Sequence, residues 1–193
     1  AGAFLKTRPD LSAPDIQLHM VTALVDDHGR KMHFTQGYSC HVCLLRPRSR
    51  GSVQLASANP DDLPLIDPAF LEDPQDLEDM VQGYKITQKI MEAPSLKRWM
   101  KKDMFTENVK SDDDIREVIR QRSDTVYHPV GSCKMGTDEQ AVVDPQLRVH
   151  GIEGLRVIDA SIMPTLIGGN TNAPAMMIAE KAVDMIRGQS RTG

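Results

Sequence analysis

Aromatic residues are scarce in this sequence, since Phe, Trp and Tyr make up 4% of its 193 residues. No apolar run approaches the ~20 residues that a transmembrane helix requires. The first residues, AGAFLKTRPD, lack the charged and then apolar layout of a signal peptide. We therefore expect a cytoplasmic protein, with peripheral association at the cytoplasmic face of a membrane left open.

Cysteine is also rare, and three residues do not make a disulfide framework. This usage favours a reducing compartment. Cys40 and Cys43 form a CxxC with His41 between them, but no helix and no second ligand pair follows. The surrounding residues favour a strand, on which positions i and i+3 face opposite sides. We expect packing cysteines and no metal site.

A basic excess is absent, because the formal net charge is −4. Nucleic-acid binding is therefore not expected. The cluster of Arg46, Arg48 and Arg50 is too short to change this and is typical of a solvated turn. With 40% hydrophobic and 26% charged residues, the chain is long enough to bury a sizeable core.

Strands are predicted in the first third of the chain. Ile16, Leu18 and Met20 alternate with polar residues, and GSVQLAS at 51–57 alternates again. Asp27-His28-Gly29 predicts a turn between strands. Residues 58–75, rich in Pro and Asp, predict a long ordered loop.

Three helices are predicted further along. One runs from Pro74 to a stop at Pro94, and a second begins after Ser111 as N-cap. The last takes Asn172 as N-cap, has Pro174 in its first turn and ends at Gly188. Residues 141–164 predict two short strands, the second at 154–159.

The stretch HPVGSCKMG places His128 before a proline, which pushes the histidine toward an extended backbone. Gly131 and Gly136 permit close approach of another backbone or a flat ligand. An imidazole with a pKa near 6.5 can accept a proton at neutral pH. The pattern suits a catalytic histidine or a hydrogen-bonded histidine in a tight turn. Ser132 and Lys134 suggest a nucleophile only weakly, because GxSxG is absent.

Three segments, at 44–71, 127–136 and 142–186, together resemble the C-terminal part of the glucose–methanol–choline (GMC) family of flavin oxidoreductases. The likeness is strongest to alcohol dehydrogenase and choline-dehydrogenase members. It implies FAD-dependent oxidation of a primary alcohol to the aldehyde. His128 matches the family's general base, and Asn170 matches its second catalytic position. Asn172 competes with Asn170, but its expected N-cap role accounts for it.

The resemblance also implies the FAD contacts. Asp159 and Ala160 match the segment that passes the pyrophosphate and ribityl chain, and contact through main-chain atoms is expected there. Asn172, Ala173 and Pro174 open the last helix, whose N-terminus would face the pyrimidine edge of the flavin.

The implied fold is α+β: a mainly antiparallel sheet with helices on one face, plus terminal strands and a helix that belong to an FAD domain. Residues 1–140 would form the substrate domain and 141–193 the FAD-domain segment. No GxGxxG occurs, so the chain resembles the C-terminal portion of a longer enzyme. Alone it is expected to lack FAD, to be inactive and to self-associate. The alternative is a non-catalytic scaffold or interaction fragment.

The sequence leaves the substrate and the electron acceptor open. Few aromatic residues are available to cage a trimethylammonium group, which favours a plain alcohol over choline. Oxygen and a membrane quinone are both compatible acceptors.

Overall fold

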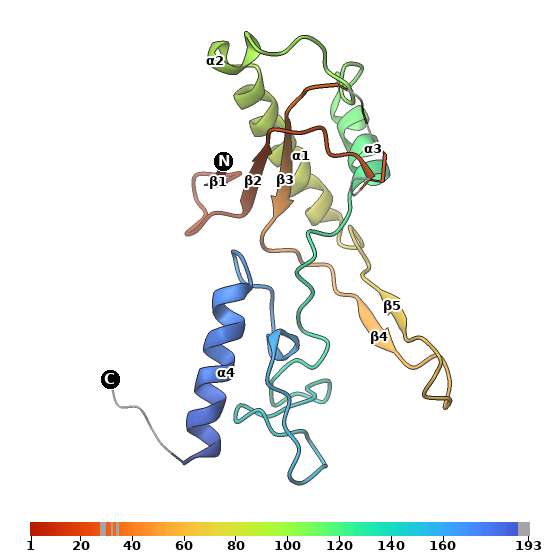
Figure 1. Cartoon of the computed structure of the whole chain (residues 1–193), viewed down its shortest axis with the longest axis vertical. Coiled ribbons are helices and arrows are strands. Elements are labelled where there is room, and N and C mark those ends of the chain that lie inside the picture. Colours follow the sequence, from red (N-terminus) through yellow and green to blue (C-terminus); the bar gives the residue numbers. More distant parts are fainter. Residues whose placement is uncertain (28–29, 32, 34, 189–193) are drawn as a thin grey trace. The chain divides into compact units, whose positions relative to one another are not determined.

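The structure is a computed structural model that describes residues 1–27, 30, 31, 33 and 35–188. Two compact units are present, one of Ala1–Gly51 with Pro68–Val126 and one of Ser52–Asp67 with Tyr127–Gly193. Helices combine with antiparallel sheet, which confirms the expected fold class (Figure 1). In the described part, no helix is long and apolar enough to cross a membrane.

The first unit is built on a three-stranded antiparallel sheet in the order β1 (Gly2–Leu5), β2 (Ile16–Val21) and β3 (Ser39–Leu44). Helix α1 (Pro74–Met91) packs on the face that carries Ile16 and Val42. A Cβ on Gly83 would lie 3.1 Å from Val42 Cγ2, so this glycine permits close approach of helix and sheet. The turn expected at 27–29 includes His28 and Gly29, which lie outside the described residues.

The two long helices of this unit begin and end where the sequence predicts, but Pro94, expected only as a stop, also begins a short helix. Asp73 caps α1 by accepting from Gln75 N at 2.8 Å, and the short α2 (Pro94–Lys97) follows. Helix α3 (Asp112–Arg122) opens with a capping box between Ser111 and Asp114. The two long helices share an apolar core of Leu77, Val81, Ile115 and Ile119.

One buried carboxylate holds the segment that leads out of β3. Asp76 is only 2% exposed, and its oxygens accept from Arg48 N at 2.8 Å, Ser49 N at 2.9 Å and Ser49 Oγ at 2.6 Å. Removing the carboxylate would leave all three donors without this acceptor. Asp76 therefore fixes the turn that the arginine cluster occupies.

Replacing Asp76 with alanine is expected to lower the free energy of unfolding by about 1–3 kcal/mol, because three partly buried donors lose their acceptor. Denaturant titration of the chain measures this. Asp62→Ala removes an exposed carboxylate that bonds Ser57 Oγ at 2.6 Å and should cost far less. Equal losses of unfolding free energy in the two variants would show that the contribution of Asp76 to stability does not depend on its burial.

A histidine pair lies across β2 and β3. His19 stands directly opposite His41, and the Nε2 atom of His41 is buried without a hydrogen-bond partner in the described chain. Burial lowers the pKa of His41, and the charge of His19 adds to this effect. The folded protein therefore resists protonation of His41 more than the unfolded chain does.

Stability is accordingly expected to fall with acidification. Above the unperturbed pKa of about 6.5 the contribution of His41 is fully present, and it is lost as the pH drops, because the unfolded chain takes up the proton more readily. His41→Phe should flatten the dependence of the unfolding free energy on pH between about 7.5 and 5.5. His150→Gln, at an exposed histidine, should leave it unchanged.

The second unit contains a hairpin that the sequence did not predict. Strand β4 (Ser52–Gln54) pairs antiparallel with β5 (Leu65–Asp67), so the expectation of a continuous loop over 58–75 is wrong. Proline and aspartate do mark the connecting turn. The strand was missed because Leu65–Asp67 lies between Pro64 and Pro68, too short for an alternating pattern to show.

Residues 141–164 do not form the two strands expected from the sequence. Only single bridges occur in this part of the described chain: Val143 with Met135 and Val149, and Arg148 with Arg156. Leu147, Gly151 and Gly154 have φ values of 65°, 76° and 75°, which break any extended run. The segment instead folds into linked turns, followed by the 3₁₀ turn η2 (Ala160–Ile162) and helix α4 (Asn172–Ile186).

Candidate functional site

The backbone around His128 is unusual on both sides. Tyr127 has a φ of 63° and Gly131 a φ of 86°. A left-handed backbone costs a non-glycine residue ~1–2 kcal/mol, so surrounding structure must impose it on Tyr127. No sequence signal marked this tyrosine. The imidazole of His128 is half-buried, and no hydrogen bond joins it to another described residue.

The residues after His128 lie against η2. Cys133 N donates to Ser161 O at 3.0 Å, and Met135 N donates to Ile162 O at 2.8 Å. A Cβ on Gly131 would stand 3.2 Å from the carbonyl oxygen of Met163. Main chain meets main chain here, which explains the small residues of HPVGSCKMG.

The turn at η2 is closed by Asp159, which serves as its N-cap. The exposed Asp159 carboxylate accepts from Ser161 N through Oδ1 at 2.7 Å. Asp159 is expected near a pyrophosphate, which would repel its carboxylate. The hydrogen bond that the carboxylate accepts from a backbone N–H offsets part of this repulsion. Ala160 is half-buried and packs on the core of the unit.

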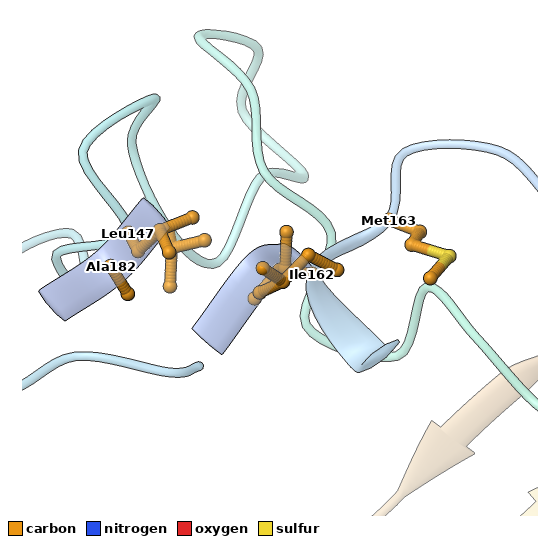
Figure 2. Close-up of a cluster of buried hydrophobic side chains, with 6 residues drawn as sticks. Leu147, Ile162, Met163 and Ala182 are labelled. Atoms are coloured by element: carbon orange, nitrogen blue, oxygen red, sulfur yellow. The ribbon is translucent and has the colours of Figure 1, made fainter. Parts of the chain in front are cut away.

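One hydrophobic core joins two of the segments that carry the resemblance, 127–136 and 142–186. Figure 2 shows Ile162 and Met163 from the η2 segment with Ala182 from α4 and Leu147 from the linked turns. Val130, two residues after His128, packs against the same cluster. The segments around His128, Asp159 and α4 are therefore parts of one packed body.

The start of α4 differs from the expectation. Asn172 is the first helical residue, and the N-cap is Thr171, whose side chain makes no capping hydrogen bond. The prediction of Asn172 as N-cap is therefore wrong. An αR backbone at Thr171 shifts the boundary by one residue. The reason for setting Asn172 aside in favour of Asn170 is lost, and both side chains are exposed.

The N-terminus of α4 is open to an anionic group. No acidic residue lies in its first turn, and no side chain caps it, whereas Asp73 and Ser111 cap the two other long helices. Pro174, half-buried, has no N–H to satisfy, and Ala173 is exposed beside it. The free N–H groups give this end of the helix about half a positive charge. The predicted end is confirmed, since Gly188 follows the last turn with a φ of 66°.

A nucleophile next to His128 is disfavoured by the surroundings of Lys134. Its Nζ lies 2.8 Å from Asp138 Oδ1, and this hydrogen bond lowers the pKa of the Asp138 carboxyl. The Lys134 side chain is thus engaged by Asp138 and not by Ser132. In the other unit, burial raises the pKa of both Cys40 and Cys43, so these thiols stay protonated and unreactive at neutral pH.

All seven predicted site residues lie in the second unit. The structure joins the main chain after His128 to the Asp159 turn, and α4 packs on the same core. No hydrogen bond joins His128 to Asn170 among the described residues. The expected domain boundary at residue 140 stays a prediction, because the compact units are defined by packing and not by what they bind.

Known structures share this architecture. Pyridoxine 4-oxidase from Mesorbium loti matches with a TM-score of 0.89 and 27% identity over 98% of this chain and 38% of that chain. Formate oxidase from Aspergillus oryzae, in a structure concerned with FAD modification, matches with a TM-score of 0.82 and 28% identity over 92% and 32%. The fold is therefore that of a part of such oxidases.

A family model described as GMC oxidoreductase matches residues 47–179. The chain belongs to the GMC oxidoreductase family. It is 49% identical to alcohol dehydrogenase (acceptor) of Pseudomonas putida over 96% of its length and 34% of that protein. It is 44% identical to mitochondrial choline dehydrogenase of Homo sapiens over 97% and 32%. The chain thus spans about a third of the length of the curated relatives it matches.

Proposed function

We propose that this chain supplies the catalytic residues of an FAD-dependent enzyme that oxidises a primary alcohol to the aldehyde. The observation that carries the proposal is the pairing of the HPVGSCKMG main chain with η2, through Cys133 N to Ser161 O and Met135 N to Ile162 O. This pairing supports the proposal, because it ties the segment that follows His128 to the turn that would contact the cofactor. The names of the relatives support the same chemistry.

The residues present fit FAD in charge and hydrogen-bonding capacity. The uncapped N-terminus of α4 offers free N–H groups and a partial positive charge to an electron-rich ring. The Asp159 carboxylate already accepts a backbone N–H, so the turn can meet the cofactor through Asp159 and Ala160 main chain. When bound, FAD would supply the acceptor for the hydride that leaves the alcohol carbon.

His128 would accept the hydroxyl proton of the alcohol at a ring nitrogen. Its imidazole is not engaged by any described residue, so a nitrogen is available to the substrate. A general base of this kind contributes ~10²–10⁴-fold to the rate. The imidazolium that results then stabilises the negative charge that develops on the substrate oxygen.

Asn170 would hold the substrate oxygen from a second direction. Its side-chain amide can donate a hydrogen bond to the oxygen as charge develops there. The side chain is exposed on the loop before α4. Asn172 has the same chemistry two residues away and competes for this role.

The substrate is proposed to be a plain primary alcohol. The 49% identical relative is an alcohol dehydrogenase, and the chain itself has only 4% aromatic residues with which to cage a choline headgroup. An anaerobic mixture of the flavin-loaded full-length enzyme with a primary alcohol should bleach the flavin absorbance. No bleaching with either an aliphatic alcohol or choline would overturn the proposal.

Asn170→Ala is expected to slow flavin reduction by the alcohol while the absorption spectrum of the bound flavin stays near normal. The loss of one hydrogen bond to a developing oxyanion costs roughly 10²-fold in comparable sites. Stopped-flow measurement without oxygen gives the rate. Asn172→Ala is the matched control, and slow reduction in Asn172→Ala alone would reverse the roles of the two asparagines.

A further inference from the structure

Gly131 differs from other left-handed glycines of the second unit in its surroundings. The φ values of Gly131, Gly151 and Gly154 are 86°, 76° and 75°. A Cβ on Gly151 or Gly154 would meet nothing within 4 Å, but a Cβ on Gly131 would lie 3.2 Å from Met163 O. A side chain at position 131 is therefore disfavoured for two reasons. The left-handed backbone is common to Gly131, Gly151 and Gly154, whereas the close contact with Met163 O occurs only at Gly131 among these three.

The chain between His128 and this contact has little freedom. Pro129 restricts the backbone of His128 to extended conformations. Val130 packs on the hydrophobic core, and Gly131 O accepts from Lys134 N at 3.1 Å in the next turn. A displacement at Gly131 is therefore transmitted to His128 with little absorbed on the way.

We propose that Gly131 is a positioning residue that sets the place of the His128 imidazole relative to the Asp159–Met163 turn. The inference rests on the proposed function, in which His128 accepts the substrate proton and that turn contacts FAD. A methyl group at 131 must move either the Met163 carbonyl or the main chain that carries His128 by a few tenths of an ångström. Either movement changes the distance between the His128 imidazole and the Asp159–Met163 turn.

Proton acceptance is sensitive to such movement, because a displacement near 1 Å can cost ~10²-fold in rate. In the flavin-loaded full-length enzyme, the smaller movement at Gly131→Ala is expected to slow flavin reduction about 4- to 10-fold at saturating alcohol. Flavin content and the alcohol concentration for half-maximal rate should change little. The pH dependence of the rate should shift, because the environment of the imidazole changes.

Two variants separate contact from backbone conformation. Gly154→Ala imposes the same left-handed strain without a clash and should reduce the flavin within about twofold of the unmodified rate, because no neighbour has to move. Gly131→Asn accepts a left-handed backbone but carries a Cβ, so it should be as slow as Gly131→Ala. If Gly131→Ala does not fold, Pro129→Ala frees the same histidine without crowding and should itself slow reduction at least about fivefold.

The outcomes distinguish this inference from the function on which it rests. Equal rates per bound flavin for Gly131→Ala and Gly154→Ala would overturn it. So would loss of flavin from Gly131→Ala with an unchanged rate per remaining flavin, since Gly131 would then serve the cofactor turn alone. If Gly131→Ala fails to fold, an unchanged rate of flavin reduction in Pro129→Ala would also overturn the inference. Full activity of His128→Ala would instead overturn the proposed catalytic base.

Discussion

His128→Ala in the flavin-loaded full-length enzyme is expected to lower kcat for alcohol oxidation at least about 10²-fold. The variant loses the acceptor for the hydroxyl proton and the cation that stabilises the alkoxide, so two effects on the same step disappear together. The imidazole makes no hydrogen bond with the described chain, and its removal should leave the fold and the bound flavin intact. Steady-state assays measure kcat, and flavin absorbance measures how much flavin stays bound.

His150 provides the matched control for that experiment. It lies in the same unit, is exposed, and its Nε2 is 3.2 Å from Gly136 O. His150→Ala should leave kcat close to the unmodified value. Activity of His128→Ala within a factor of a few of that control would rule out His128 as the base.

The helices could be predicted because their signals are local. Pro74 marks the start of α1 because its missing N–H costs nothing in the first turn, and Ser111 marks the start of α3 because its side chain accepts from Asp114 N. The exception is the start of α4, where Asn172 has the chemistry of a cap but Thr171 takes the position without capping. An uncapped helix end leaves no local energetic signal for sequence analysis to find.

The short strands could not be predicted reliably, because they depend on partners. β5 has three residues and is held by register with β4, as in the pairing of Val53 with Ile66. Residues 154–159 have a strand-like composition, but Gly154 with its φ of 75° and single bridges leave them in turns. Propensity acts on each residue, whereas pairing is decided by contacts far along the chain.

The candidate site was predicted by pattern, while its geometry came from the structure. The motifs around His128, Asp159 and the start of α4 match one family arrangement. The motifs did not predict that Cys133 and Met135 would donate to the carbonyl groups of η2, or that Tyr127 would have a positive φ. Main-chain hydrogen bonds and backbone strain carry no residue-type signature, so they become visible only in coordinates.

The isolated 193-residue chain is expected to be colourless and to bind no FAD at micromolar concentration. Its residues include the proposed base and one open helix end but no GxGxxG turn, which in dinucleotide-binding folds cradles the pyrophosphate. Titration with FAD, followed by flavin fluorescence and by absorbance of the purified protein, tests this. Yellow protein with about one flavin per chain would contradict the expectation, because the glycine-rich turn would then be dispensable.

The same chain is expected to self-associate through α4. Its apolar side chains Met176, Met177, Val183 and Ile186 are 57%, 59%, 41% and 58% exposed, beside the buried side that carries Ile178 and Ala182. Exposed apolar patches of this kind mark interaction surfaces or aggregation sites. Met176→Glu, on the same face as Val183, should shift sedimentation toward the monomer with unchanged helix content, while Lys181→Glu, at an exposed polar position on another face of the helix, should not. A monomeric unmodified chain with a well-packed α4 would show that this apolar surface is stable in water, and the expectation of self-association would then be wrong.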